Sequence, residues 1–259
     1  MLNKPKWLNA VAVAVYVFLY LPIVVLVVFS FEQSRLAVHW TGFTLKWYAQ
    51  LLTDQTLALA LTNSLIVAVT AVIAAGIMGT MAAVGLARLH FAGKEIFRAL
   101  VLLPLIIPEI AMAVSALTLF LAMGLTLGLA TIIVAHIVFC ISYVTLTVIG
   151  RLDGIDPRLE EAARDLGASP LMAFFRVTLP LLMPGIIAGC LLAFVLSLDD
   201  FVITQFTAGV GATTLPLRIY SLVKFGVSPE INALSTLMIC TTVALTLCAE
   251  TLGKKKATL

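Results

Sequence analysis

Three acidic residues lie well inside long apolar runs of the sequence, Glu109, Asp199 and Asp200, while a fourth, Glu250, lies at the end of such a run. An ionised carboxylate at the centre of a membrane helix costs about 2.5–3.5 kcal/mol on insertion scales, so it is kept where it faces protein or water. Such a carboxylate can pair with a cation, or it can accept hydrogen bonds from hydroxyl groups such as that of Thr204. The three acids are therefore candidates for lining a cation path, with structural pairing as the alternative.

The sequence around these acids limits how they can act. Adjacent positions on a helix point about 100° apart, so Asp199 and Asp200 cannot both face one path unless the helix is broken there. Pro104 and Pro108 each lack a backbone donor, and we expect them to bend or break the helix just before Glu109.

Residue sets for covalent, metal or nucleotide chemistry do not stand out in the sequence. His136 lies in an apolar run without a second His or a fixed carboxylate nearby in sequence, so a packed, hydrogen-bonded role is favoured over a relay or a ligand. There is no G-x-x-x-x-G-K-[ST] phosphate loop and no Ser-His-Asp spacing. The cysteines lack a C-x-x-C pair and are expected to be buried apolar side chains; they are Cys140, Cys190, Cys240 and Cys248. We expect no catalytic residue, no metal site and no cofactor bound by this chain. If the protein does work against a gradient, the energy must therefore come from elsewhere.

The elements that carry these residues are membrane spans. Of the 259 residues, 62% are hydrophobic and 11% are charged, which lies outside the range of soluble domains. Apolar runs of about 20 residues or more, enough to cross a hydrocarbon core, occur at Leu8–Phe31, Thr62–Ala87, Phe97–Ala122, Leu125–Ile149, Leu181–Phe206 and Ile231–Leu252. The sequence therefore predicts an all-α integral membrane protein with six transmembrane helices.

The orientation follows from the basic residues. With a cytoplasmic N-terminus, twelve Lys and Arg lie inside and four lie outside; the four are Arg35, Lys46, Arg218 and Lys224. Both termini are then cytoplasmic. The first run is expected to be a retained anchor, residues 8–31, because "FSFEQSR" after it lacks a small-x-small cleavage site. We expect a single domain of residues 1–259, with a five-helix core over residues 60–252.

One cytoplasmic loop, residues 151–180, is unusually polar and contains "LEEAARDLGASP". Asp156 suits an N-cap, Pro157 suits the first helical position and Gly167 suits a left-handed end, which predicts a short helix over Pro157–Leu166. Leu159, Ala162, Ala163 and Leu166 form its apolar stripe. Ser169 and Pro170 start a second short helix, "LMAFFRV", before "TLPLLMPG" turns the chain back into the membrane. The small stripe residues predict close docking of another surface.

Three other readings of this loop are weaker, and one of them is a plain structural loop, which so long a spaced motif disfavours. A lipid-surface helix or a DNA-reading helix pair would carry excess positive charge. The segment Arg151–Thr178 instead has four Arg against five acidic residues.

"EAARDLGASPLMAFFRVTLP" resembles the E-A-A-x3-G-x9-I-x-L-P signature of inner-membrane permeases of ATP-binding-cassette (ABC) importers. The matching residues are Glu161, Ala162, Ala163, Gly167, Leu179 and Pro180, with Val177 at the usual isoleucine position. The resemblance implies a type I ABC importer permease (MetI-like) fold and a coupling loop that seats in the ATPase subunit. It places Glu161 at the interface with the ATPase subunit, where Ala162 and Ala163 would allow the two proteins to pack closely.

A second resemblance narrows the substrate. "LSLDDFVITQFTAG", "LPLRIYSLVKFGVSPEINALST" and "GFTLKWYAQLL" are similar to the spermidine/putrescine importer permeases over nearly the whole chain. This implies polyamine import across a bacterial inner membrane, with putrescine favoured. The implied partners are a periplasmic polyamine-binding protein, a second related permease subunit and an ATPase dimer that uses ATP and Mg.

A self-sufficient ion-coupled secondary transporter or channel for a small cation remains the alternative. Reconstitution of the chain alone discriminates the two, because only the alternative would transport without an ATPase.

Overall fold

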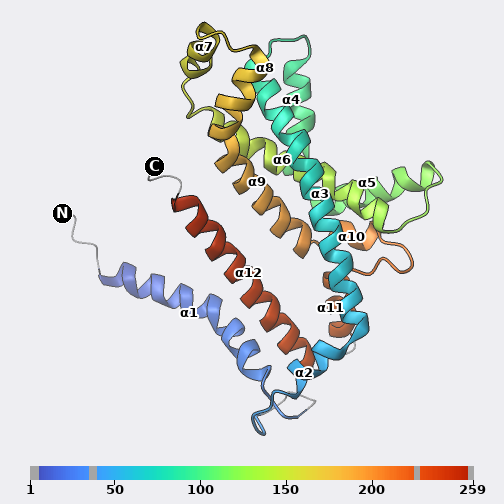
Figure 1. Cartoon of the computed structure of the whole chain (residues 1–259). Coiled ribbons are helices and arrows are strands. Elements are labelled where there is room, and N and C mark those ends of the chain that lie inside the picture. The colour runs from blue at the N-terminus through green and yellow to red at the C-terminus, as the bar shows by residue number, and fades with distance from the viewer. Residues whose placement is uncertain (1–5, 35–39, 225–227, 256–259) are drawn as a thin grey trace. The chain divides into compact units, whose positions relative to one another are not determined.

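The structure is a computed structural model (Figure 1) that describes residues 6–34, 40–224 and 228–255, with side chains for residues 7–34, 40–224 and 228–244. The described residues form helices and loops, with one isolated bridge between Glu32 and Phe43. They divide into two compact units: residues 1–58 with 219–245, and residues 59–218 with 246–259. The predicted all-α class is confirmed.

Four helical stretches of the described chain are long and apolar enough to cross a membrane. They are Trp7–Phe29 in α1 (Lys6–Phe29), α3 (Gln55–Arg88), α6 (Leu129–Leu152) and Pro170–Asp199. A bent pair, Lys94–Leu105 with Glu109–Ala122, adds a fifth span if it is counted as one. The predicted sixth span lies in α12 (Pro229–Lys255), where side chains beyond residue 244 fall outside the described part. The count of six, and the division into anchor and core, therefore stay predictions.

In the first unit, the buried side chain of Glu32 holds the loop between α1 and α2 (Lys46–Thr53). Its carboxylate accepts hydrogen bonds from the N–H of Ser34 at 2.8 Å, from the N–H of Thr41 at 2.9 Å and from the Thr41 hydroxyl. Trp47 on α2 donates its Nε1–H to the Glu32 carbonyl at 2.7 Å. Burial alone would raise the pKa of Glu32, but these hydrogen bonds outweigh it and lower the pKa from its ordinary value of 4.5.

In the second unit, α6 is the central helix and packs closely on α9 (Leu179–Asp199). A Cβ added at Gly189 of α9 would lie 3.1 Å from Val144 Cα of α6, so glycine permits the approach. Small residues have this role where membrane helices meet. On α3, the Gly79 carbonyl accepts a hydrogen bond from the Thr145 hydroxyl of α6 at 3.2 Å. The core of this unit is therefore built around α6.

The third predicted span, Phe97–Ala122, is wrong as a single helix. α4 (Lys94–Leu102) and the 3-10 turn η1 (Leu103–Leu105) meet α5 (Glu109–Ala122) at a bend of 108°. Pro104 lies in η1, and Pro108, with an extended ψ of 134°, directly precedes Glu109. Because a proline cannot donate to the carbonyl four residues before it, two prolines at this spacing interrupt the helix. The expected break before Glu109 is confirmed.

The fifth predicted span, Leu181–Phe206, has different ends. α8 (Pro170–Ala173), the π-helical turn η2 (Phe174–Thr178) and α9 run on without interruption. The second loop helix therefore begins at Pro170 as predicted, but its separation from the span by a turn at "TLPLLMPG" is wrong. The π turn lies directly before Pro180, whose missing N–H leaves the Arg176 carbonyl without its helical donor. At its other end the span stops at Asp199, and α10 (Val202–Thr207) begins after Phe201.

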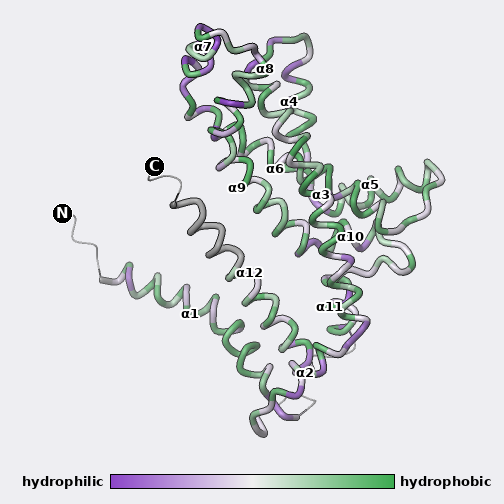
Figure 2. Tube along the Cα trace, in the orientation of Figure 1, coloured by the Kyte–Doolittle hydropathy of each residue, from purple (hydrophilic) through white to green (hydrophobic). Residues whose placement is uncertain are grey.

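The predicted loop helix is confirmed as α7 (Arg158–Asp165). The Asp156 carboxylate accepts a hydrogen bond from the Arg158 N–H at 2.9 Å, and Gly167 has a φ of +89°. Ser169 caps α8 by accepting from the Met172 N–H at 3.3 Å. Figure 2 shows polar residues gathered along α7, in contrast to the apolar α9.

Candidate functional site

Two helix breaks of the second unit lie together. One precedes α5, where Pro108 gives way to Glu109; the other separates α9 from α10 at Asp200. α5 packs against α10 (Figure 1), which brings the two breaks and their acidic residues to one region. Broken helices of this kind line cavities in many transporters. The fold therefore gathers Glu109, Asp199 and Asp200 around two interruptions of the bundle.

Asp200 is turned into the protein. Its backbone is extended, with a ψ of 123°, and its carboxylate accepts from the Ile203 N–H at 3.3 Å and the Thr204 N–H at 2.8 Å. The Thr204 hydroxyl donates to the same carboxylate at 2.7 Å. Only 8% of the Asp200 surface is exposed. Asp200 thus caps α10, and the bonding to Thr204 that the sequence left open as a structural alternative is present.

Asp199 and Glu109 are exposed. Among the residues that the structure describes, neither carboxylate has a hydrogen-bond or ion-pair partner. An exposed carboxylate in a membrane helix needs water, a cation or a partner surface, so these two residues mark a polar place in an apolar bundle.

The buried side chain of His136 lies next to the second break, between α9 and α10. Its ring nitrogens contact Ser197 Oγ at 2.7 Å and Thr204 Oγ1 at 3.0 Å, and Nε2 lies 3.2 Å from Asp200 Oδ2. The predicted packed, hydrogen-bonded role is confirmed. The sequence could not reveal these partners, because they lie 61 and 68 residues further along the chain.

The signature residues of the loop lie on α7, just after it, and at the junction of η2 and α9. On α7, Glu161 and Ala162 are exposed and Ala163 is half-buried, while the flanking Leu159 and Leu166 are exposed to 48% and 90%. The remaining signature residues are Gly167, which is exposed and follows α7; Val177 and Leu179, which are half-buried; and Pro180, which is exposed. The last three lie on η2 and the start of α9. α7 contacts η2, so the loop presents one folded surface with exposed apolar side chains.

Glu160, one residue before the signature, has a role that the sequence analysis missed. Its carboxylate forms an ion pair with Arg88 at the end of α3, bonds Arg164 Nη2 at 3.0 Å and accepts from the Thr178 hydroxyl at 2.7 Å. Its side chain is 12% exposed. The i, i+4 spacing of Glu160 and Arg164 is the one signal in the sequence that pointed to this arrangement. Glu160 therefore ties α7 to α3 and η2.

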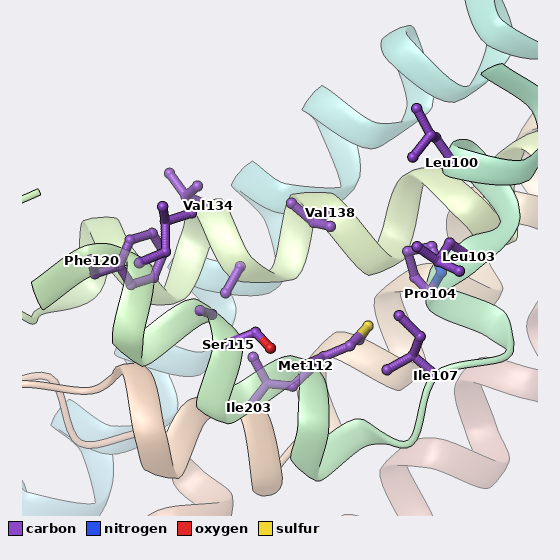
Figure 3. A pocket seen from close by; sticks show the side chains of 13 residues that line it. Leu100, Leu103, Pro104, Ile107, Met112, Ser115, Phe120, Val134, Val138 and Ile203 are labelled. Carbon is purple, nitrogen blue, oxygen red and sulfur yellow. The ribbon is translucent and has the colours of Figure 1, made fainter. Parts of the chain in front are cut away.

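An apolar pocket lies on the inside of the α4–α5 bend (Figure 3). Its volume is about 340 Å³, and α6 and α10 complete its wall. Ser115 supplies the one side-chain hydroxyl among the lining residues, which otherwise are aliphatic, aromatic or methionine. A protonated amine would lose its hydration there without enough acceptors in return, so this pocket is unsuited to a cationic ligand.

Comparison with known proteins identifies the family. The sequence profile of the family described as "Binding-protein-dependent transport system inner membrane component" matches residues 75–254, a range that contains Glu109, Asp199 and the whole signature loop. The chain belongs to this family.

Relatives of known name support this membership. The spermidine/putrescine transport system permease protein PotC of Haemophilus influenzae is 42% identical over 229 residues, which cover 88% of this chain and 89% of PotC. The putrescine transport system permease protein PotI of Escherichia coli K12 is 46% identical over 220 residues, which cover 82% of this chain and 78% of PotI.

Solved structures agree on the fold. A chain of a bacterial ABC transporter involved in the import of the acidic polysaccharide alginate superimposes with a TM-score of 0.75 at 18% identity, covering 95% of both chains. The expected type I ABC importer permease fold is confirmed, and the protein is a multi-pass membrane component of a transport system.

Proposed function

We propose that this permease subunit imports a polyamine, with putrescine as its expected substrate, from the periplasm to the cytoplasm. The names of its relatives PotC and PotI support this substrate class. The observation that carries the proposal is the pair of exposed carboxylates, Glu109 and Asp199, at two helix breaks that pack together.

The chemistry of these carboxylates suits a polyamine. Primary amines on alkyl chains stay protonated at neutral pH, as the lysine side chain does. Two exposed carboxylates can accept hydrogen bonds from such ammonium groups while the substrate passes. Asp200 has no such role in this proposal, because its carboxylate is already occupied by the donors of α10.

The signature loop is proposed as the docking surface for an ATP-binding subunit. Leu159, Leu166 and the small residues Ala162 and Ala163 form a surface that another protein can approach closely, and Glu161 stands exposed beside them. ATP and Mg are used by that partner, not by this chain. A second, related permease subunit and a periplasmic polyamine-binding protein complete the assembly, and the family description names dependence on a binding protein. Both termini and α7 lie in the cytoplasm.

Reconstitution tests this function. The permease, its sibling permease and the ATPase are placed in proteoliposomes that contain ATP, and labelled putrescine is offered with the binding protein. We expect ATP-dependent accumulation, competition by spermidine and none by a neutral diol of the same length. Transport by this chain alone would overturn the proposal in favour of a secondary carrier, and so would full uptake without the ATPase.

A further inference from the structure

His136 lies in the first half of α6 and is 1% exposed. A buried imidazole in an apolar bundle is costly unless both ring nitrogens are hydrogen-bonded. Here the two nitrogens reach opposite sides of one helix break. Nδ1 contacts Ser197 on α9, before the break, and Nε2 contacts Thr204 on α10, after the break.

The contacts form one closed set of hydrogen bonds. If Nε2–H donates to Asp200 Oδ2 at 3.2 Å and the Ser197 hydroxyl donates to Nδ1 at 2.7 Å, both ring nitrogens are satisfied. The Thr204 hydroxyl then donates to Asp200 at 2.7 Å. The side chains of His136 and Asp200 are 1% and 3% exposed, so water does not compete for these bonds. A network satisfied in this way specifies one geometry.

We infer that His136 is a positioning residue for the translocation path: by bridging α9 and α10 it keeps the break at Asp200 open, with Asp200 buried and Asp199 exposed. If α9 continued as a regular helix through Asp200, the directions of the two adjacent side chains would be fixed about 100° apart. The break frees Asp199 from that constraint. The inference rests on the proposed function for the importance of Asp199, but its central claim concerns geometry.

The first test measures that geometry without transport. Asp199→Cys is made in the assembled importer after the four native cysteines are replaced by Ala, and labelling by a cationic methanethiosulfonate is followed. Adding His136→Phe should slow the labelling about tenfold, since bonds to a charged group are lost. His136→Gln, which keeps a donor near the Nε2 position, should restore most of the rate. Phe139→Leu, a packing change beside His136 on the same helix, is the control and should leave the rate unchanged.

The second test measures putrescine uptake with Asp199 intact. We expect His136→Phe to raise the KM about tenfold with a smaller change in the maximal rate, because substrate contact is affected more than assembly. Ser197→Ala removes the α9 side of the bridge without adding volume, so it gives the same test if His136→Phe fails to assemble. Unchanged labelling and KM in an assembled His136→Phe or Ser197→Ala importer would overturn the inference.

The two proposals fail separately. Full uptake by Asp199→Asn would refute the role of Asp199 in the path, while the labelling rates would still decide whether His136 sets its orientation. Loss of uptake in Asp199→Asn together with normal labelling in His136→Phe would refute the bridge alone.

Discussion

Asp199 and Asp200 are adjacent in the chain, yet Asp199 is exposed, whereas Asp200 is buried and its carboxylate interacts with Thr204 and His136. The helix ends between them, so the two carboxylates occupy different environments. The sequence left open which of them faces the path. Their burial favours Asp199 for the path and Asp200 for structure.

The two aspartates should therefore respond differently to amidation. Asp199→Asn should assemble with its partners, keep ATPase activity and lose polyamine uptake by about tenfold or more, since the charge that attracts the cation is gone. Asp200→Asn should lower the yield of assembled complex, because hydrogen bonds to a charged acceptor are worth about 1.5–3 kcal/mol. Size-exclusion chromatography and uptake assays measure both effects. Full transport by both variants would remove these carboxylates from the mechanism.

Ala163 tests the docking surface on α7. Replacing this half-buried alanine with Asp, or with the bulkier Leu, should leave the permease inserted but weaken ATPase binding and abolish uptake, because a small side chain is needed for close approach. Ala92→Asp, at an exposed position between α3 and α4, is the matched control and should have no effect. Co-purification of the ATPase with the permease gives the readout. Normal uptake with Ala163→Asp would refute the docking role.

Glu160 and Arg88 test how α7 is held. Glu160→Gln and Arg88→Gln should each loosen α7 by about 1 kcal/mol, which corresponds to about fivefold faster local hydrogen exchange over residues 158–165. The double variant should lose little more than either single one, because both remove the same ion pair. Strictly additive effects would show that the two side chains act independently. Glu161→Gln, at the exposed neighbour, should leave the exchange rates unchanged.

Gly189 tests the contact between α6 and α9. Gly189→Ala would place a Cβ 3.1 Å from Val144 Cα and 3.2 Å from Thr147 Cβ, so it should destabilise the protein by about 1–3 kcal/mol through overpacking. Gly150→Ala, on α6 itself, has open space around the new Cβ and should be neutral or slightly stabilising. Thermal unfolding in detergent compares the two variants. Equal melting temperatures would contradict the close approach.

Glu32 gives the loop between α1 and α2 a dependence on pH. Its pKa is lowered in the folded protein, so the stabilisation is fully present above the ordinary value of 4.5 and is lost as the pH falls below it. We expect protease cleavage near residues 40–44 to increase on acidification from pH 5 in the native protein. Glu32→Gln should be cleaved readily at neutral pH and change little with acid. A pH response that is identical in both proteins would exclude Glu32 as its source.

The sequence by itself determined the features that depend on local chemistry. The caps predicted at Asp156 and Ser169 and the left-handed turn predicted at Gly167 are present, because such features are decided by residues within a few positions. The break before Glu109 followed from Pro108, whose missing N–H acts within its own turn. Membrane spans were found because hydropathy over about 20 residues is also a local sum.

The tertiary structure decided which polar groups meet. Nothing near Asp200 in the sequence disclosed that His136 lies against it, or that α9 ends one residue earlier, because that break is stabilised by an imidazole on another helix. In the same way the sequence did not indicate the role of Glu160, because its ion-pair partner Arg88 lies at the end of α3. Local sequence patterns determine where a helix begins or ends when the residues responsible lie in the same turn. Long-range hydrogen bonds and ion pairs, which act only after the helices have packed, fixed which carboxylates are buried and which remain exposed.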